Sequence, residues 1–109
     1  MKLTTATQRR IEVLELRVRI ETLARRCVVT AAGDSAKVRN GGFVHGRLLF
    51  ALISADSDSI PDRHRQVRLV QFVYRRACDV LHGRVDALQI SNAIIQEWRF
   101  AVVQLEQSV

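Results

Sequence analysis

The residue types that could carry out chemistry or hold a metal are few and scattered in this chain. The candidates are the histidines, the cysteines and one acidic stretch: His45, His64, His82, Cys27, Cys78, Asp56, Asp58 and Asp62. Cys78 and His82 are four residues apart, a spacing that places two ligands on one helix face, but no second pair accompanies them. We therefore predict no metal site. We interpret His82 as a residue of the last helical turn that interacts favourably with the helix dipole.

The other candidate motifs each lack a required residue. The acids between Asp56 and Asp62 alternate like the ligands of a calcium loop, but Pro61 stands where a Gly is needed and Val67 where a Glu is needed. Gly41-Gly42 lacks the Lys-Ser/Thr of a phosphate-binding loop. No Ser–His–acid or Cys–His pattern is present, so we predict no catalytic residue, no cofactor and no enzyme activity.

The strongest pointer to a function is Phe72. When residues 60–82 are projected as a helix, Phe72 falls opposite an apolar arc that includes Leu69, and it is surrounded by basic residues. These are Arg65, Arg68, Arg75 and Arg76. An aromatic anchor beside arginines is typical of a protein-binding surface, whereas the plainer interpretation is a Phe packed against the end of a neighbouring helix. We predict a partner-binding patch made of Phe72 and these four arginines.

Net charge leaves a nucleic-acid alternative open. The formal net charge is +6, and of the 17 basic residues only Lys2 and Lys37 are Lys. Basic residues are spread along the chain rather than gathered in one arm, which weakens the case for a nucleic-acid tail. The alternative function is a nucleic-acid-binding helical module that uses the Arg face of the third helix together with the basic first helix.

The elements that must position these residues are helices. The chain has 109 residues, 48% of them hydrophobic, with one Pro and five Gly, which favours a single domain with long elements and few turns. Apolar periodicity predicts helices at about 5–29, 43–54, 60–82 and 86–107, with a flexible loop at 31–42 and the short second helix mostly buried. The predicted fold class is all-α, a four-helix bundle-like domain built on a long C-terminal αα-hairpin.

The break between the last two helices is specified closely. Gly83 stands where a helix ends and a left-handed backbone is required. Asp86 and Gln89, three residues apart, are spaced as the capping box of the next helix.

Surplus apolar helix surface predicts a homodimer. The first helix has a principal stripe, Val13, Leu16, Ile20, Leu23 and Cys27, and a second, thinner one that includes Ile11, Leu14 and Val18. Glu15 and Arg19 have the spacing of an ion pair on this helix. The fourth helix has a second face poor in charge, which includes Ala93, Gln96, Phe100 and Val103. We predict that these two sets form the dimer interface.

The expected setting is the cytoplasm. No apolar run approaches the roughly 20 residues of a membrane span, and Met1–Thr5 lacks a secretory core. Cys27 and Cys78 fall on apolar helix faces, as expected for buried reduced thiols. The sequence thus favours a small regulatory or adaptor protein that acts by binding another protein.

Overall fold

Residues 4–32 and 44–109, which this computed structural model describes, fold into helices and short 3₁₀ turns without a strand. The helices are α1 (Thr5–Ala32), α2 (Val44–Leu48), α3 (Ile60–Leu81) and α4 (Asn92–Ser108). The 3₁₀ turns are η1 (Leu49–Leu52), η2 (Ser57–Ser59) and η3 (Ala87–Gln89). The four helices pack against one another, which confirms the predicted all-α class. None of the described helices is long and apolar enough to cross a membrane.

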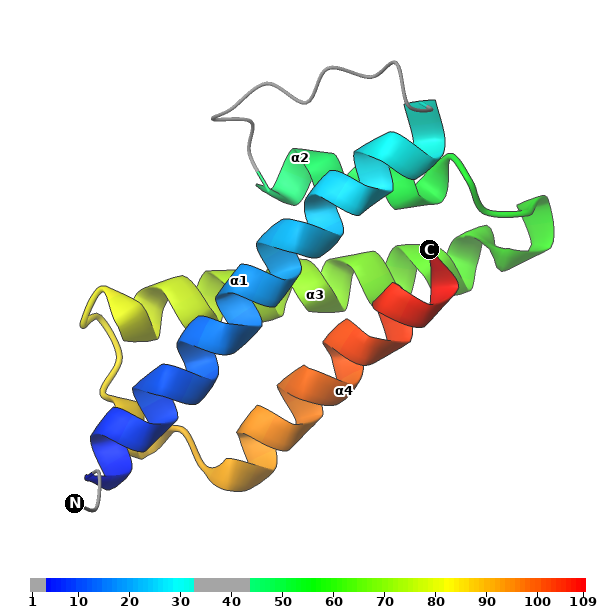
Figure 1. Cartoon of the computed structure of the whole chain (residues 1–109). Helices are drawn as coiled ribbons and strands as arrows, with labels where there is room; N and C mark the ends of the chain where they lie inside the picture. The colour runs from blue at the N-terminus through cyan, green and yellow to red at the C-terminus, as the bar shows by residue number, and fades with distance from the viewer. Residues whose placement is uncertain (1–3, 33–43) are drawn as a thin grey trace.

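Helices α1 and α4 run side by side in the same direction, and α3 crosses both of them (Figure 1). Helix α2 and η1 lie over the C-terminal half of α1 and close that end of the molecule (Figure 1). The outer side of the α3–α4 pair, away from α1, is not covered by another described element. This arrangement leaves one side of the two C-terminal helices open to solvent.

The core is built from one apolar stripe on each long helix. On α1 the predicted principal stripe is buried, and Ala24 completes it. Helices α3 and α4 contribute small and medium residues, which let the helices approach closely: Val67, Val70, Val73, Ala77, Val80, Ile95, Ala101, Val102 and Leu105. Trp98 on α4, only 6% exposed, is the largest side chain of the core.

The second helix differs from its prediction. The helical turn ends at Leu48, a 3₁₀ turn follows, and Phe43 lies outside the described residues. Leu48 and Ala51 are buried, but their neighbours Leu49 and Phe50 are exposed, so the expectation of a mostly buried helix was wrong. The physical reason is that this short element touches α1 and α3 on one side only, and a three-residue repeat turns one side chain in three toward them.

The start of the fourth helix also differs from its prediction. Asp86 does not begin α4; its carboxylate accepts a hydrogen bond from the Leu88 N–H at 2.9 Å and caps η3 instead. Helix α4 begins six residues later, where the Ser91 hydroxyl accepts from the Ile94 N–H at 3.2 Å. The 3₁₀ turn puts Ala87 and Ile90, three residues apart, into the core together, which a continuous α-helix would do less well.

The C-terminal ends of α3 and α1 lie close to where the sequence predicted them. Gly83 has φ +76°, so the predicted left-handed residue after α3 is confirmed. Helix α1 continues to Ala32, which takes the first two residues of the predicted loop into the helix. The remainder of that predicted loop, 33–42, lies outside the described residues.

Candidate functional site

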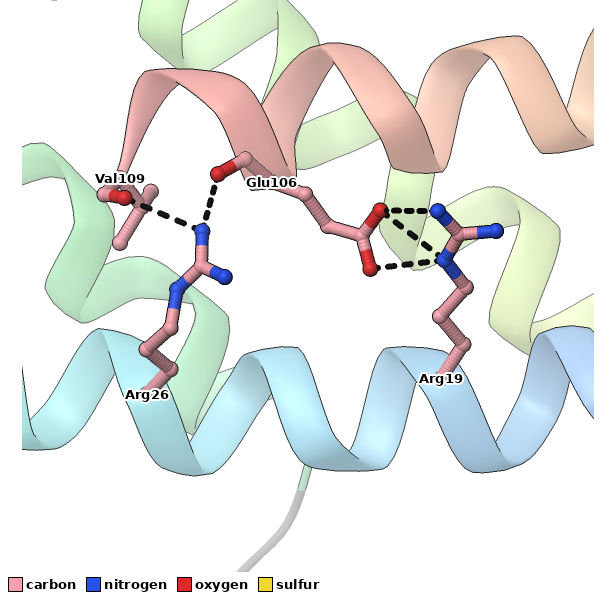
Figure 2. A network of polar contacts seen from close by, with 4 residues as sticks. All are labelled: Arg19, Arg26, Glu106 and Val109. Atoms are coloured by element: carbon pink, nitrogen blue, oxygen red, sulfur yellow. Dashed lines mark hydrogen bonds and ion pairs between the residues drawn. The ribbon is translucent and has the colours of Figure 1, made fainter.

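Arginines from α1 hold the C-terminal end of α4. Arg19 Nε lies 2.9 and 2.8 Å from the two carboxylate oxygens of Glu106, and Arg19 Nη2 lies 2.7 Å from Oε1 (Figure 2). These hydrogen bonds raise the pKa of Arg19. Arg26 donates to the backbone carbonyls of Glu106 and Val109, the second at 3.0 Å (Figure 2). Arg26 thus pairs with carbonyls that a helix end leaves without partners, and both cations interact favourably with the negative end of the helix dipole.

Two further arginines join distant segments in the same way. Arg63 on α3 donates to the Ala51 carbonyl at 2.9 Å and to the Ser108 carbonyl at 2.8 Å, so one side chain links η1, α3 and α4. Arg9 on α1 donates to the Leu88 carbonyl of η3 at 3.0 Å. These contacts fix α4 against the rest of the molecule and so determine where its outer face lies relative to α3.

The outer face of α3 is different, because its basic residues are not used to hold other helices. Phe72 is 48% exposed, as the sequence predicted. Among the described residues, Arg65 and Arg76 each pair only with an acid three residues away on the same helix, Asp62 at 3.2 Å and Asp79 at 3.8 Å. The Arg65–Asp62 pair is exposed and contributes little to stability, because water and salt screen it, whereas the Arg76–Asp79 pair is partly buried. Arg68 has no ion pair within the part of the chain that the structure describes.

A groove between α3 and α4 begins at Phe72. It has a volume of about 500 Å³. Its walls are aromatic and aliphatic side chains, with one amide and one carboxylate among them. The lining residues are Leu69, Phe72, Gln96, Glu97, Trp98 and Phe100. An adjoining hollow of about 440 Å³ extends the groove toward η3. Its lining residues are Phe72, Arg76, Val85, Gln89, Ile90, Ile94, Glu97 and Trp98. Phe72, Glu97 and Trp98 line both, so together they form one surface, which we call the Phe72 groove.

The structure groups the predicted site residues differently from the sequence. Gln96 and Phe100, predicted for a dimer interface, line the groove together with Phe72. Phe100 is 64% exposed, more than any other aromatic residue of the described chain. Ala93 is also exposed on α4, and Val103 is partly covered. Ile11, Leu14 and Val18 do not line the groove; they are exposed on α1, on the side away from its buried stripe.

Sequence reasoning missed or misplaced several residues of the Phe72 groove. Leu69 was assigned to the buried arc of its helix but is exposed on the groove wall. Neither Glu97 nor Trp98 was singled out as a site residue. The available signal was that Leu69 lies three residues before Phe72, a spacing that makes two side chains neighbours on a helix surface.

Arg75 lies on the other flank of α3, toward α2. Burial lowers the pKa of His45 on α2, and the positive charge of Arg75 lowers it further. The His45 and Tyr74 rings meet edge to face, with their centres 5.7 Å apart, and the buried Gln71 donates to the His45 carbonyl at 2.9 Å. Burial also raises the pKa of Tyr74. These contacts join α2 to α3, so Arg75 is less well placed for the groove than Arg68 or Arg76.

The reactive residue types form no cluster. Among the described residues, no three of His, Cys, Asp and Glu come close enough to hold a metal ion. Cys27 and Cys78 are free, and burial raises the pKa of the Cys27 thiol, which favours its unreactive protonated form.

Comparison with known proteins does not connect this groove to a described activity, since no family model, curated protein or solved structure matches the chain.

Proposed function

We propose that this protein is a small regulatory or adaptor protein that binds an amphipathic helix of another protein in the Phe72 groove. The α3–α4 pair acts in this proposal as an αα-hairpin platform. The observation that carries the proposal is that two exposed phenylalanines, Phe72 and Phe100, come from different helices and line one groove above Trp98. The homodimer stays a prediction, and in this proposal Gln96 and Phe100 belong to the groove and not to the dimer interface.

Exposed aromatic residues in a groove favour a protein ligand. Single apolar residues on a surface are ordinary, but a contiguous hollow with aromatic walls is where binding energy concentrates in interfaces. Phe72, Phe100 and Leu69 bring large apolar surfaces that a partner can remove from water, at about 25 cal/mol for each Å² covered. A groove between two helices accepts a third helix that lays its apolar face along it.

The charges around the groove favour acidic residues beside that apolar face. Arg68 and Arg76 lie one helical turn before and after Phe72, and neither is used to hold another helix. An Arg side chain offers several hydrogen-bond donors in a fixed plane, which suits a carboxylate. Glu97 lies within the groove and can accept from one N–H or basic group of the partner. We therefore expect a helix with an apolar stripe and acidic flanks.

The internal use of arginines weighs against the nucleic-acid alternative. Arg9, Arg19 and Arg26 of the basic first helix donate to η3 and α4, which reduces the charge that α1 can offer to phosphates. An apolar groove with a carboxylate in it is also poorly matched to a phosphate backbone. Nucleic-acid binding is therefore the less favoured function, and the binding experiment can detect it.

The experiment is a selection from a peptide-display library, with the wild-type chain as bait and the Phe72→Ala variant as counter-bait. We expect enriched peptides with apolar residues spaced i, i+3 or i+4, and i+7, flanked by Asp or Glu. The best peptide should bind at least about tenfold more weakly to Phe72→Ala and to Phe100→Ala, because both side chains are proposed anchors. Ile53→Ala, which shortens an exposed apolar residue outside the groove, is the matched control and should bind normally.

Three results would overturn the proposal. They are no enrichment over the counter-bait, peptides that bind Phe72→Ala as well as the wild type, and flanks that are basic rather than acidic. A duplex DNA or RNA that binds more tightly than any peptide, with affinity that falls steeply as salt rises, would support the nucleic-acid function instead. A second copy seated in the groove would appear as self-association that Phe100→Ala abolishes.

A further inference from the structure

A second apolar surface lies on α1, on the side opposite its buried stripe. Leu14 is 47% exposed and Val18 53% exposed, and Ile11 is exposed one turn earlier. The buried residues Val13 and Ile20 point to the other side of the helix, since they are offset by about half a turn. No described element covers the exposed stripe, so α1 has an apolar face available to another molecule.

The spacing of this stripe is that of a helix–helix seam. Ile11, Leu14 and Val18 follow steps of three and four residues, the pattern that keeps side chains in line between two paired helices. Thr22 continues the face without adding an unsatisfied group, because its hydroxyl donates to the Val18 carbonyl at 3.0 Å. Arg25, exposed on the same face, interrupts the apolar surface before Val29, which is 39% exposed.

The charges beside the stripe suggest what would cover it. On the sides of α1 that adjoin the core, the cations are occupied: Arg9 by Leu88, Arg17 by Glu21 and Arg19 by Glu106. Arg10 and Glu15 flank the exposed stripe on its two sides, and neither has an ion pair in the part of the chain that the structure describes. Arg19, which the sequence paired with Glu15, is occupied by Glu106 and leaves Glu15 unpaired.

We propose that a second copy of this chain covers the stripe, with the two α1 helices packed in parallel. In a parallel pair, residues five positions apart on the flanks of the seam meet across the interface, so Arg10 of each copy faces Glu15 of the other. An antiparallel pair would instead bring Arg10 toward Arg17 of the other copy, which is repulsive. The contact is short, about 18 Å from Ile11 to Thr22 at 1.5 Å per residue, so we expect a weak dimer.

The test is sedimentation equilibrium of the full chain. The wild type is expected to dimerise with a Kd on the order of 10 μM. Leu14→Glu should weaken the dimer at least about tenfold, because it places like charges at the centre of the contact. Leu14 is half exposed, so circular dichroism should show that this variant folds.

Charge reversal tests the parallel arrangement. Arg10→Glu and Glu15→Arg should each weaken self-association, because each variant places like charges across the seam. Mixing the two variants should restore a dimer, since the carboxylate introduced at position 10 of one chain then faces the guanidinium introduced at position 15 of the other. Phe100→Ala should leave the dimer unchanged, which separates this surface from the proposed partner groove.

Three results would overturn the inference. They are a wild type that stays monomeric at several hundred micromolar, a dimer that Phe100→Ala abolishes, and charge-reversed chains that fail to pair when mixed. None of these results depends on whether the Phe72 groove binds another protein.

Discussion

The contact between α1 and α4 and the outer face of α3 use the same residue type in opposite ways. Between α1 and α4, Arg19 and Arg26 are directed at one acidic side chain and at backbone carbonyls of α4 (Figure 2). On the outer face of α3, Arg65 and Arg76 reach only acids on their own helix, and Arg68 has no ion pair in the described chain. The first region holds the molecule together, and the second is open to a partner.

This difference shows that the presence of arginine does not by itself identify a binding surface. In the first region each guanidinium has a target that the fold supplies, an unpaired carbonyl or carboxylate at a helix end. In the second region the fold supplies no such target, and an exposed aromatic residue lies among the cations. The comparison predicts that Arg substitutions in the first region reduce stability, whereas those in the second reduce only binding.

The largest expected effect is that of Arg63→Ala, because Arg63, although it lies on α3, is directed like Arg26 at backbone carbonyls of other segments. Arg63 joins the Ala51 and Ser108 carbonyls, and its loss removes two charge-assisted hydrogen bonds between three segments. We expect the free energy of unfolding to fall by about 2 kcal/mol, measured by urea denaturation. Arg68→Ala is the matched control and should change it by less than about 0.5 kcal/mol. Equal effects of the two substitutions would contradict the proposed difference between the regions.

A smaller effect is expected for the Arg19–Glu106 pair. A double-mutant cycle with Arg19→Ala and Glu106→Gln should give a coupling energy of about 1 kcal/mol, because the pair is bidentate but partly exposed. The coupling should decrease as salt is raised. The same cycle on Arg65 and Asp62, a largely exposed pair, provides the comparison and should give a coupling close to zero. A larger coupling energy for Arg65 and Asp62 than for Arg19 and Glu106 would contradict the proposed difference between the two regions.

Phe72→Ala should have only a modest effect on folding, in contrast to its effect on binding. Because Phe72 is about half exposed, the stability loss should be within about 1 kcal/mol. Thermal and urea unfolding check this, with Val73→Ala, a fully buried neighbour, expected to lose more. If Phe72→Ala unfolds the protein, Phe72 belongs to the core and the groove loses its proposed anchor.

The smallest expected effect is a pH dependence from His45. Its folded-state pKa lies below the ordinary 6.5 because of burial and the charge of Arg75. As pH falls through 6.5, the unfolded chain binds the proton more readily than the folded chain, so stability decreases. His45→Gln should flatten this decrease in urea unfolding curves measured between about pH 5.5 and 7.5. A free energy of unfolding that increases toward lower pH in this range would contradict the prediction.

Local patterns predicted most of the helices because periodicity and backbone chemistry are local. The buried stripe of α1, the exposure of Phe72 and the left-handed Gly83 all follow from spacing or from one residue's conformational freedom. The start of α4 was missed because Asp86 and Ser91 are both good caps, and the packing of Ala87 and Ile90 decides between them. A sequence pattern alone does not report that packing.

The groove was not predictable as a unit, because it depends on contacts between distant residues. Glu15 was the expected partner of Arg19 on the same helix, yet Arg19 reaches Glu106 from the other end of the chain. That contact and its neighbours set the position of α4, and thereby bring Phe100 and Gln96 beside Phe72. The sequence identified these three residues but divided them between two surfaces.

The emission of Trp98 tests the central proposal most directly, because Trp98 is the single tryptophan of the chain and lines both parts of the Phe72 groove. A helical peptide with an apolar stripe and acidic flanks should change this emission in a saturable titration of the wild type. The same titration of Phe72→Ala should show at least about tenfold weaker binding. A wild-type emission unaffected by the peptide, or an identical titration of the variant, would contradict the account.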